Sequence, residues 1–188
     1  MDGERSMRER MLAGESFRFD DSFAADVTKC RGLLRRINDA TPDQDAERDG
    51  WLGKLLGAFG EGSNIRPPFR CELGMLTYVG DRVFANFGLV CLDIAPVTIG
   101  DDTRIGPGVQ LLTPLHPLEP GPRREGWERG EPITIGRNVW LGGGVVVLPG
   151  VTIGDDTVVG AGSVVVHDLP PGVLAVGNPA RVIRPLLD

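Results

Sequence analysis

Residues 135 to 165 read IGRNVWLGGGVVVLPGVTIGDDTVVGAGSVV, and an aliphatic residue recurs at every sixth position of this stretch. The recurring residues are Ile135, Leu141, Val147, Ile153, Val159 and Val165. Glycine follows four of them directly, and a small or β-branched residue follows five of them by four positions. A period of six is neither the 3.6 of an α-helix nor the 2 of a simple strand. It indicates the hexapeptide repeat of a parallel β-helix, in which each hexad makes one short strand and one corner.

The same period extends toward the N-terminus in a weaker form. It is present at Ile99, Ile105 and Leu111, and more faintly at Val79, Ala85 and Cys91. Three hexads complete one triangular coil, and the inward aliphatic side chains of stacked coils bury one another. Glycine after the aliphatic residue permits a corner where φ is positive or space is tight. We therefore predict a mainly β fold, with a parallel β-helix over residues 61–188.

Residues 1–60 follow a helical period instead and are predicted to form an α-helical cap region. Ser6 and Glu9 match a capping box with Gly14 as the stop, and Thr41–Gln44 matches a second capping box. A helix after Asp20–Ser22 is predicted from apolar residues spaced by three and four: Phe23, Val27, Cys30, Leu34 and Ile37. A last helix, with its buried stripe at Leu52, Leu55, Leu56 and Phe59, is expected to close at Gly60. The cap region either only covers the end of the β-helix or also shapes a binding pocket.

Length and composition limit the class of protein. The chain has 188 residues, which suit one domain plus a modest appendage, and only 6% of them are aromatic. The formal net charge of -6 and the lack of a basic stripe argue against nucleic-acid binding. The N-terminus has no continuous apolar stretch, so we expect neither a signal peptide nor a membrane anchor, and a cytoplasmic protein with free thiols. No metal-ligand spacing is visible, and no metal is expected.

Segments along nearly the whole chain share one family pattern. They are Ala13–Glu15, Leu33–Asn38, Pro67–Cys71, Asn138–Gly142, Pro149–Gly154, Gly160–Val165 and Gly177–Arg184. These segments resemble the galactoside and maltose O-acetyltransferases. The resemblance implies a left-handed coil, acetyl transfer from acetyl-CoA to a sugar hydroxyl, and a homotrimer with active sites between neighbouring β-helices. A smooth solenoid has little concavity of its own, which also favours a cleft formed by assembly.

His116 is the candidate catalytic residue. It lies where the hexad pattern stops, at the start of a Pro-, Gly- and charge-rich excursion over residues 116–132. Sites are often built on loops that interrupt a rigid scaffold, and imidazole suits removal of a hydroxyl proton near neutral pH. The residue type alone slightly favours a histidine on a surface loop. Its Thr-x-x-His-Pro context matches the catalytic histidine of the resembling family, which implies a general base in a direct transfer without a covalent enzyme intermediate.

The resemblance also implies acceptor-binding residues. They are Asn86, Asp93, Glu72 and Asp20, with Asp21 as the alternative to Asp20. Amide and carboxylate groups complement sugar hydroxyls, which both donate and accept hydrogen bonds. Glu72 stands where the family often has Asp, so the charge is kept while the reach changes. The residue types allow other roles, because Asn86 also suits a corner with left-handed backbone and Asp93 also suits the cap of a turn.

For CoA, the resemblance implies contacts at Gly143, Ala161, Val166, His167, Arg181 and Arg184. Small residues let the pantetheine arm approach the backbone, and the arginines suit anionic phosphates, although they also suit plain solvation of the tail. The family often has serine at the position of Gly143, so here only a backbone N–H is available for the oxyanion. The family usually has Thr-Lys where this chain has Val166-His167, and we therefore hypothesise weaker and more pH-sensitive binding of CoA phosphate.

Several alternatives stay open. Trp127, in the excursion, is predicted either to stack on a sugar ring or to pack on a neighbouring subunit. An enzyme of the same fold acting on an antibiotic, an amino sugar or another natural product is the first competing function. A β-helix carbonic anhydrase would need three zinc-binding histidines, and His116 and His167 are the only two in the chain. A non-catalytic β-helix used for assembly is opposed by the presence of His116, Asn86 and the tail arginines.

Overall fold

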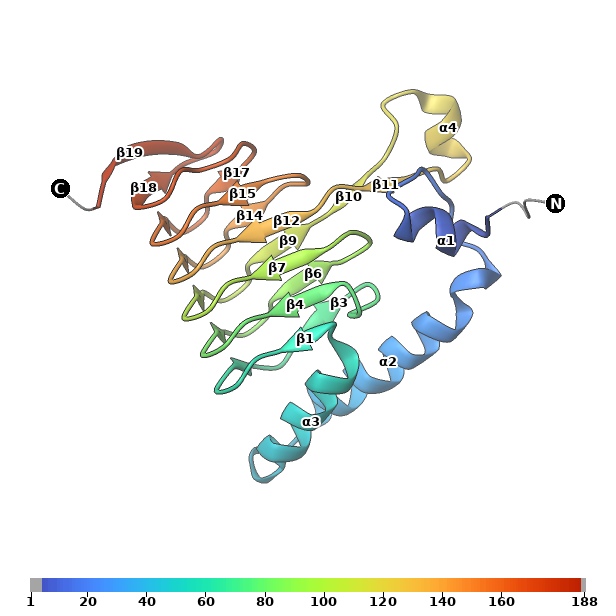
Figure 1. Cartoon of the computed structure of the whole chain (residues 1–188), viewed down its shortest axis with the longest axis horizontal. Helices are drawn as coiled ribbons and strands as arrows, with labels where there is room; N and C mark the ends of the chain where they lie inside the picture. Colours follow the sequence, from blue (N-terminus) through green and yellow to red (C-terminus); the bar gives the residue numbers. More distant parts are fainter. Residues whose placement is uncertain (1–4, 187–188) are drawn as a thin grey trace.

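The computed structural model describes residues 5–186 and consists of a β-solenoid with helices packed beside its first coils (Figure 1). Each coil passes through three faces, so that equivalent strands of successive coils stack as three separate sheets. Strands of successive coils pair in parallel in each of these sheets. The parallel β-helix predicted from the hexad period is confirmed.

The three sheets account for most of the strands. The first sheet contains β1 (Ala58–Phe59), β4 (Thr77–Val79), β7 (Val97–Ile99), β12 (Ile133–Ile135) and β15 (Thr152–Ile153). The second contains β2 (Asn64–Ile65), β5 (Phe84–Ala85), β8 (Arg104–Ile105), β13 (Trp140–Leu141), β16 (Val158–Val159), β18 (Val173–Val176) and β19 (Arg181–Pro185). The third contains β3 (Arg70–Cys71), β6 (Val90–Leu92), β9 (Gln110–Leu112), β14 (Val146–Val147) and β17 (Val164–Val165). Only the last strand of the second sheet, β19, runs antiparallel to its neighbour.

The aliphatic residues of the repeat form one continuous core. In the third sheet, Val147 pairs with Leu111 on one side and with Val165 on the other. These three side chains are at most 1% exposed. The same in-register stacking holds in the other two sheets, for instance between Ile99, Ile135 and Ile153. Each aliphatic side chain is therefore covered by the coils on either side, which is the source of stability in a stacked repeat.

Close approach of the coils explains the glycines that follow the aliphatic residues. A Cβ on Gly142 would lie 2.5 Å from the backbone nitrogen of Ala161 in the next coil. The positive φ of this corner falls instead at Gly144, at 68°. Gly142, directly after the strand, is therefore required by tight space, and Gly144 is required by its left-handed backbone.

The helices largely match their sequence signals. They are α1 (Met7–Leu12), the 3-10 turn η1 (Asp21–Phe23), α2 (Ala24–Asp39), the 3-10 turn η2 (Pro42–Gln44) and α3 (Asp45–Leu55). Both predicted capping boxes, at Ser6 and at Thr41, are formed. No helix in residues 5–186 is long and apolar enough to cross a membrane.

The predicted end of the last helix at Gly60 is wrong. The helix α3 ends at Leu55, and Phe59 lies in β1 rather than on the helix. The backbone N–H of Gly57 already donates to the carbonyl of Thr77 in the next coil, and Phe59 pairs with Val79. Pairing with β4 therefore takes these residues into the first coil, because a strand partner satisfies their backbone groups as well as a helix would.

The excursion after β9 folds back over the cap region (Figure 1). It contains β10 (Pro114–Leu115), α4 (Pro120–Arg124) and β11 (Arg129–Gly130), and β10 and β11 pair antiparallel. Phe17 of the cap forms an antiparallel bridge with Glu128 of the excursion, through two hydrogen bonds of 2.9 and 3.0 Å. The cap and the excursion are thus joined beside His116.

Candidate functional site

The predicted site residues divide between two corners at opposite ends of the third-sheet strands. The small-residue corner, between the second and third sheets, consists of residues 86–88, 106–108, 142–144 and 160–162. The loop corner, between the third and first sheets, consists of residues 72–76, 93–96, 113–132, 148–151 and 166–168. Asn86, Gly143 and Ala161 lie at the first corner, whereas His116 lies at the second. Within one chain, the breadth of the third sheet separates the two groups.

The small-residue corner presents free backbone donors. Its successive coils are joined by hydrogen bonds such as those from Gly144 N to Pro107 O and from Gly162 N to Gly143 O. The backbone N–H groups of Gly143 and Ala161 have no acceptor within residues 5–186. Because these positions carry little or no side chain, a ligand can approach both donors closely. In the coil that contains Asn86, the left-handed backbone position at this corner is Gly88, with φ 78°. Asn86 itself does not have a positive φ, so it does not fill the left-handed position of the corner.

His116 is exposed at the loop corner and is oriented by one backbone contact. Its Nδ1 lies 3.3 Å from the carbonyl oxygen of Trp127. A carbonyl oxygen can only accept, so Nδ1 carries the hydrogen and donates. The neutral ring then has its lone pair on Nε2, which is the atom able to take a proton from a hydroxyl group.

A cavity of about 540 Å³ opens beside His116 and is lined by acidic side chains from the cap and the excursion. Asp20 lines it, as predicted for an acceptor-site residue, together with Glu125 and Glu128, while Asp21 does not line it. Arg18 is the lining cation. The structure therefore brings Asp20 and His116 together, and the cap region shapes a pocket as well as covering the coils.

Two carboxyl groups near His116 are held above their ordinary pKa. Burial raises the pKa of Glu128, and the charge of Glu72 raises it further while the charge of His116 opposes the rise. Partial desolvation, together with the charge of Asp93, raises the pKa of Glu72, and Arg31 opposes this rise. The charges of Glu72 and His116 both act on Glu128, which places Glu128 in the electrostatic surroundings of the candidate base.

Asp93, for which acceptor binding stays a prediction, is held in a network of backbone hydrogen bonds. Its side chain is 0% exposed. One carboxylate oxygen accepts the backbone N–H groups of Glu72, Leu73 and Gly74, and the other accepts that of Leu76 at 3.2 Å. Burial still raises the pKa of Asp93, although these backbone donors oppose the rise. Asp93 matches its alternative role as the cap of a turn, and it fixes the turn that begins with Glu72.

We expect Asp93→Asn to lower the free energy of unfolding by about 1–3 kcal/mol. An amide keeps only one acceptor oxygen. Its NH₂ group would face either the backbone N–H of Leu76 or the three N–H groups of residues 72–74, and a donor facing a donor forms no hydrogen bond. Urea denaturation measures the change. Asp101→Asn is the matched control, because Asp101 accepts one backbone N–H, from Asp81 at 2.8 Å, and an amide oxygen can replace that acceptor. An equal loss in both variants would contradict the assignment.

The residues predicted for CoA divide between both ends of the third sheet and the tail. Val166 and His167 follow β17 at the loop corner, and His167 is exposed. Arg181 and Arg184 are exposed on β19, where they lie opposite Val176 and Leu174. Within residues 5–186, neither arginine lines a cavity together with His116, so a ligand that contacts all three residues of one copy would extend along the coils.

Trp127 packs against arginines of its own chain, and its stacking on a sugar ring or packing on a neighbouring subunit stays a prediction. Its ring lies under the guanidinium groups of Arg18 and Arg10, at 4.9 and 5.7 Å from the ring centroid, and it does not line the cavity. Glu128 also lines the cavity, and it is not among the site residues predicted from the sequence. Its position depends on the bridge to Phe17, and no local motif signals a pairing between segments so distant in the sequence.

No group of three or more His, Cys, Asp or Glu residues in the described part of the chain is arranged to hold a metal ion. Cys30 and Cys71 lie with their sulfurs 3.7 Å apart as free thiols. They join α2 to β3 inside the core and take no part in the site.

Two family models match the chain. Residues 10–60 match the maltose acetyltransferase hexapeptide capping motif, and residues 132–167 match the bacterial transferase hexapeptide (six repeats). The first match coincides with the cap region, and the second with the most regular coils. Five of the seven segments that carry the resemblance lie within these matches, and Pro67–Cys71 and Gly177–Arg184 lie outside them.

Similarity to individual proteins extends over almost the whole chain. Nodulation protein L of Rhizobium leguminosarum bv. viciae is 49% identical, over 95% of this chain and 94% of that protein. Galactoside O-acetyltransferase of Escherichia coli is 40% identical, over 97% of this chain and 90% of that protein. A hexapeptide-repeat acetyltransferase of Vibrio cholerae, solved in complex with acetyl coenzyme A, superposes with a TM-score of 0.91 at 41% identity, over 98% of this chain and 100% of that one.

Proposed function

Since this chain belongs to the galactoside and maltose O-acetyltransferase family of hexapeptide-repeat proteins, we propose that it transfers acetyl from acetyl-CoA to a sugar hydroxyl. Acetyl-CoA dependence follows from the relatives, one of which was solved with acetyl coenzyme A. The observation that supports the proposal most directly is the geometry of His116, an exposed imidazole beside an acidic cavity with its Nδ1 engaged by a carbonyl.

His116 acts as the general base in this proposal. Its Nε2 takes the proton of the acceptor hydroxyl as the oxygen attacks the thioester carbonyl, and the ring returns that proton to the departing CoA sulfur. Acetyl-CoA is already an activated donor, so no covalent enzyme intermediate is needed. General-base assistance of this kind contributes about 10²–10⁴-fold to the rate.

The Gly143 N–H is the proposed donor to the oxyanion that develops during the transfer. It has no acceptor within residues 5–186, so it needs no rearrangement to bind the developing charge. The Ala161 N–H, one coil further along the same corner, is free in the same way and suits an amide carbonyl of the pantetheine arm. The residues of this corner therefore fit CoA, and Arg181 and Arg184 supply charge for its phosphates.

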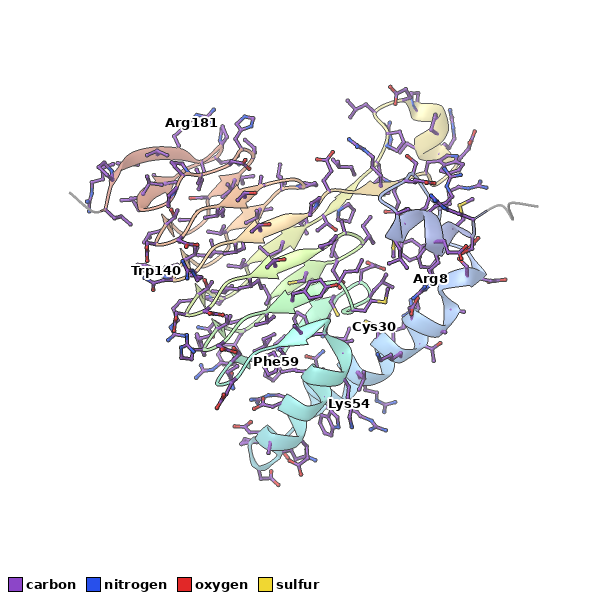
Figure 2. The ribbon with its side chains drawn as sticks, viewed as in Figure 1. Arg8, Cys30, Lys54, Phe59, Trp140 and Arg181 are labelled. Atoms are coloured by element: carbon purple, nitrogen blue, oxygen red, sulfur yellow. The ribbon has the colours of Figure 1, made fainter. Side chains whose placement is uncertain are left out.

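A homotrimer would complete the site. The base lies at the loop corner, the oxyanion donor lies at the small-residue corner, and one copy cannot bring them together across its own third sheet. If the small-residue corner of one copy faces the loop corner of the next, the contact repeats around a closed ring. Exposed apolar side chains beside the small-residue corner support such a contact, since Phe87 and Trp140 are 51% and 57% exposed. Figure 2 shows Trp140 at one edge of the coils and Arg8, in the cap, beyond the opposite edge.

We expect His167→Lys to tighten CoA binding, by about three- to fivefold at pH 8. Imidazole changes its charge between pH 5 and 8, whereas lysine stays positive through this range. The wild type should therefore bind CoA more tightly at pH 6 than at pH 8, and the variant should bind equally at both. Calorimetric titration with CoA measures the affinities, and equal affinity of the two proteins from pH 6 to 8 would remove His167 from the phosphate site.

A second acceptor class is favoured by the charge of the cavity. Asp20, Glu125 and Glu128 line it, and the charge of Glu72 acts on Glu128. Among the described lining residues, Arg18 is the only arginine or lysine. Such surroundings favour an acceptor with a protonated amine, such as an amino sugar that is still acetylated on a hydroxyl group. Neutral sugars would rely on hydrogen bonds to the same carboxylates.

An acceptor panel tests the proposed function. Release of free CoA thiol is measured with acetyl-CoA and maltose, a β-galactoside, glucosamine or N-acetylglucosamine. Turnover with any of these, and an O-acetyl product by mass spectrometry, supports O-acetyl transfer to a sugar. A preference for glucosamine over N-acetylglucosamine selects the amine-bearing class. No turnover with any sugar, while CoA still binds, would overturn the sugar assignment.

A further inference from the structure

The Trp127 side chain is half-buried, although it follows a polar segment, residues 122–126, that is exposed. Its ring lies under Arg18 at 4.9 Å and Arg10 at 5.7 Å, and its Nε1 donates to Glu125 at 3.2 Å. The Trp127 backbone N–H donates to Pro122, which closes the excursion on itself. Arg18 forms no ion pair within residues 5–186, so its charge is available to the indole face.

The next residue is held by the same segment of the cap. Glu128 exchanges two backbone hydrogen bonds with Phe17, whose side chain is 0% exposed. The cap therefore contacts two consecutive residues of the excursion. Phe17 bonds to the backbone of Glu128, and the Arg18 guanidinium packs on the Trp127 ring. The peptide unit between these two positions contains the Trp127 carbonyl, which accepts the hydrogen of His116 Nδ1.

We propose that Trp127, clamped by Arg18 and Arg10, is a positioning residue that fixes His116 in the Nδ1–H tautomer through its own carbonyl oxygen. The inference rests on the proposed role of His116 as the base. Which nitrogen of a neutral imidazole carries the hydrogen is set by the partner of the other nitrogen. A carbonyl that moves out of reach would leave the ring free to place its hydrogen on Nε2, where it cannot accept the hydroxyl proton.

The test is the tautomer itself, read by nitrogen NMR on the full chain labelled at histidine. The chain has only two histidines, so the spectrum of His116→Ala identifies the remaining signal as His167. Wild type is expected to show a protonated Nδ1 and an unprotonated Nε2 for neutral His116. In Trp127→Ala the signals should move toward a mixture of the two tautomers. In the same variant kcat should fall about tenfold, with both KM values within twofold of wild type.

Trp127→Phe is the matched control. It keeps an aromatic face for the two arginines and loses only the Nε1 hydrogen bond to Glu125, so it should retain the wild-type tautomer and most of kcat. If Trp127→Ala does not fold, Arg18→Met removes the nearer cation while leaving the indole in place, and its NMR spectrum decides in the same way.

Two results separate this inference from the proposed function. A wild-type tautomer in Trp127→Ala, or in Arg18→Met if the first does not fold, overturns the positioning role whatever the kcat of the variant. Full activity of His116→Ala would instead remove the base and overturn the mechanism, whatever the tautomer. Loss of activity in His116→Ala with an unchanged tautomer in Trp127→Ala leaves the mechanism intact and rejects the positioning role alone.

Discussion

His116→Ala is expected to lower kcat by about 10²–10⁴-fold, which is the range for removal of a general base. The imidazole is exposed at the loop corner, and the carbonyl of Trp127 directs its Nε2 lone pair away from the backbone. Alanine removes the proton acceptor, and His116 is the only histidine among the described residues that line the cavity. Steady-state rates with acetyl-CoA and the best acceptor of the panel give the ratio.

Acetyl-CoA binding provides the control for this variant. The predicted CoA contacts lie at the small-residue corner, after β17 and on β19, so calorimetry should give the wild-type affinity in His116→Ala. His167→Ala should do the opposite, raising KM for acetyl-CoA while kcat stays near wild type. Turnover by His116→Ala at the wild-type rate would exclude the base mechanism.

Coexpression of two variants that each lack one proposed site residue is expected to give more activity than either variant alone. Asn86 lies at the small-residue corner and His116 at the loop corner, so in the proposed assembly each site takes these residues from neighbouring copies. When Asn86→Ala and His116→Ala are coexpressed in equal amounts, roughly a quarter of the sites in a random ring should combine an intact His116 with an intact Asn86. Activity of the purified mixed oligomer, set against each variant alone, measures this.

The complementation also distinguishes between the two possible locations of the site. If each site were built within one chain, every site of the mixed oligomer would lack one of the two residues, and activity would equal that of the single variants. A third preparation, the double variant coexpressed with wild type, shows whether the chains mix, because tagged and untagged copies should then purify together. Co-purification without recovered activity would contradict a site shared between copies.

The fold could be predicted because its signals are local and repeated. Ile135 to Val165 contribute an inward aliphatic residue at every sixth position, and each such residue is buried in the same way as the last. The capping boxes at Ser6 and Thr41 involve neighbours three residues apart, and both form. The predicted end of α3 is wrong because Phe59, whose spacing fits a helix, pairs with β4 of the next coil.

The site could be predicted only in part. The interruption of the repeat identified the loop that carries His116, and resemblance placed Asp20 near it, where the cavity has both residues. The residue type of Asp93 allows either an acceptor ligand or a turn cap. Its buried carboxylate accepts four backbone N–H groups, as the cap requires, and its contact with an acceptor stays a prediction.

Periodicity and capping motifs are properties of short windows, so the coils, the cap helices and the position of the excursion follow from the order of residues alone. The contacts that orient the base are of another kind. The bridge between Phe17 and Glu128 and the arginines over Trp127 join the cap to the excursion, which is far from it in the sequence. The carbonyl at His116 belongs to the excursion segment that these contacts hold. Such contacts depend on how the cap packs beside the finished coils, and packing between distant segments leaves no periodic trace in the chain.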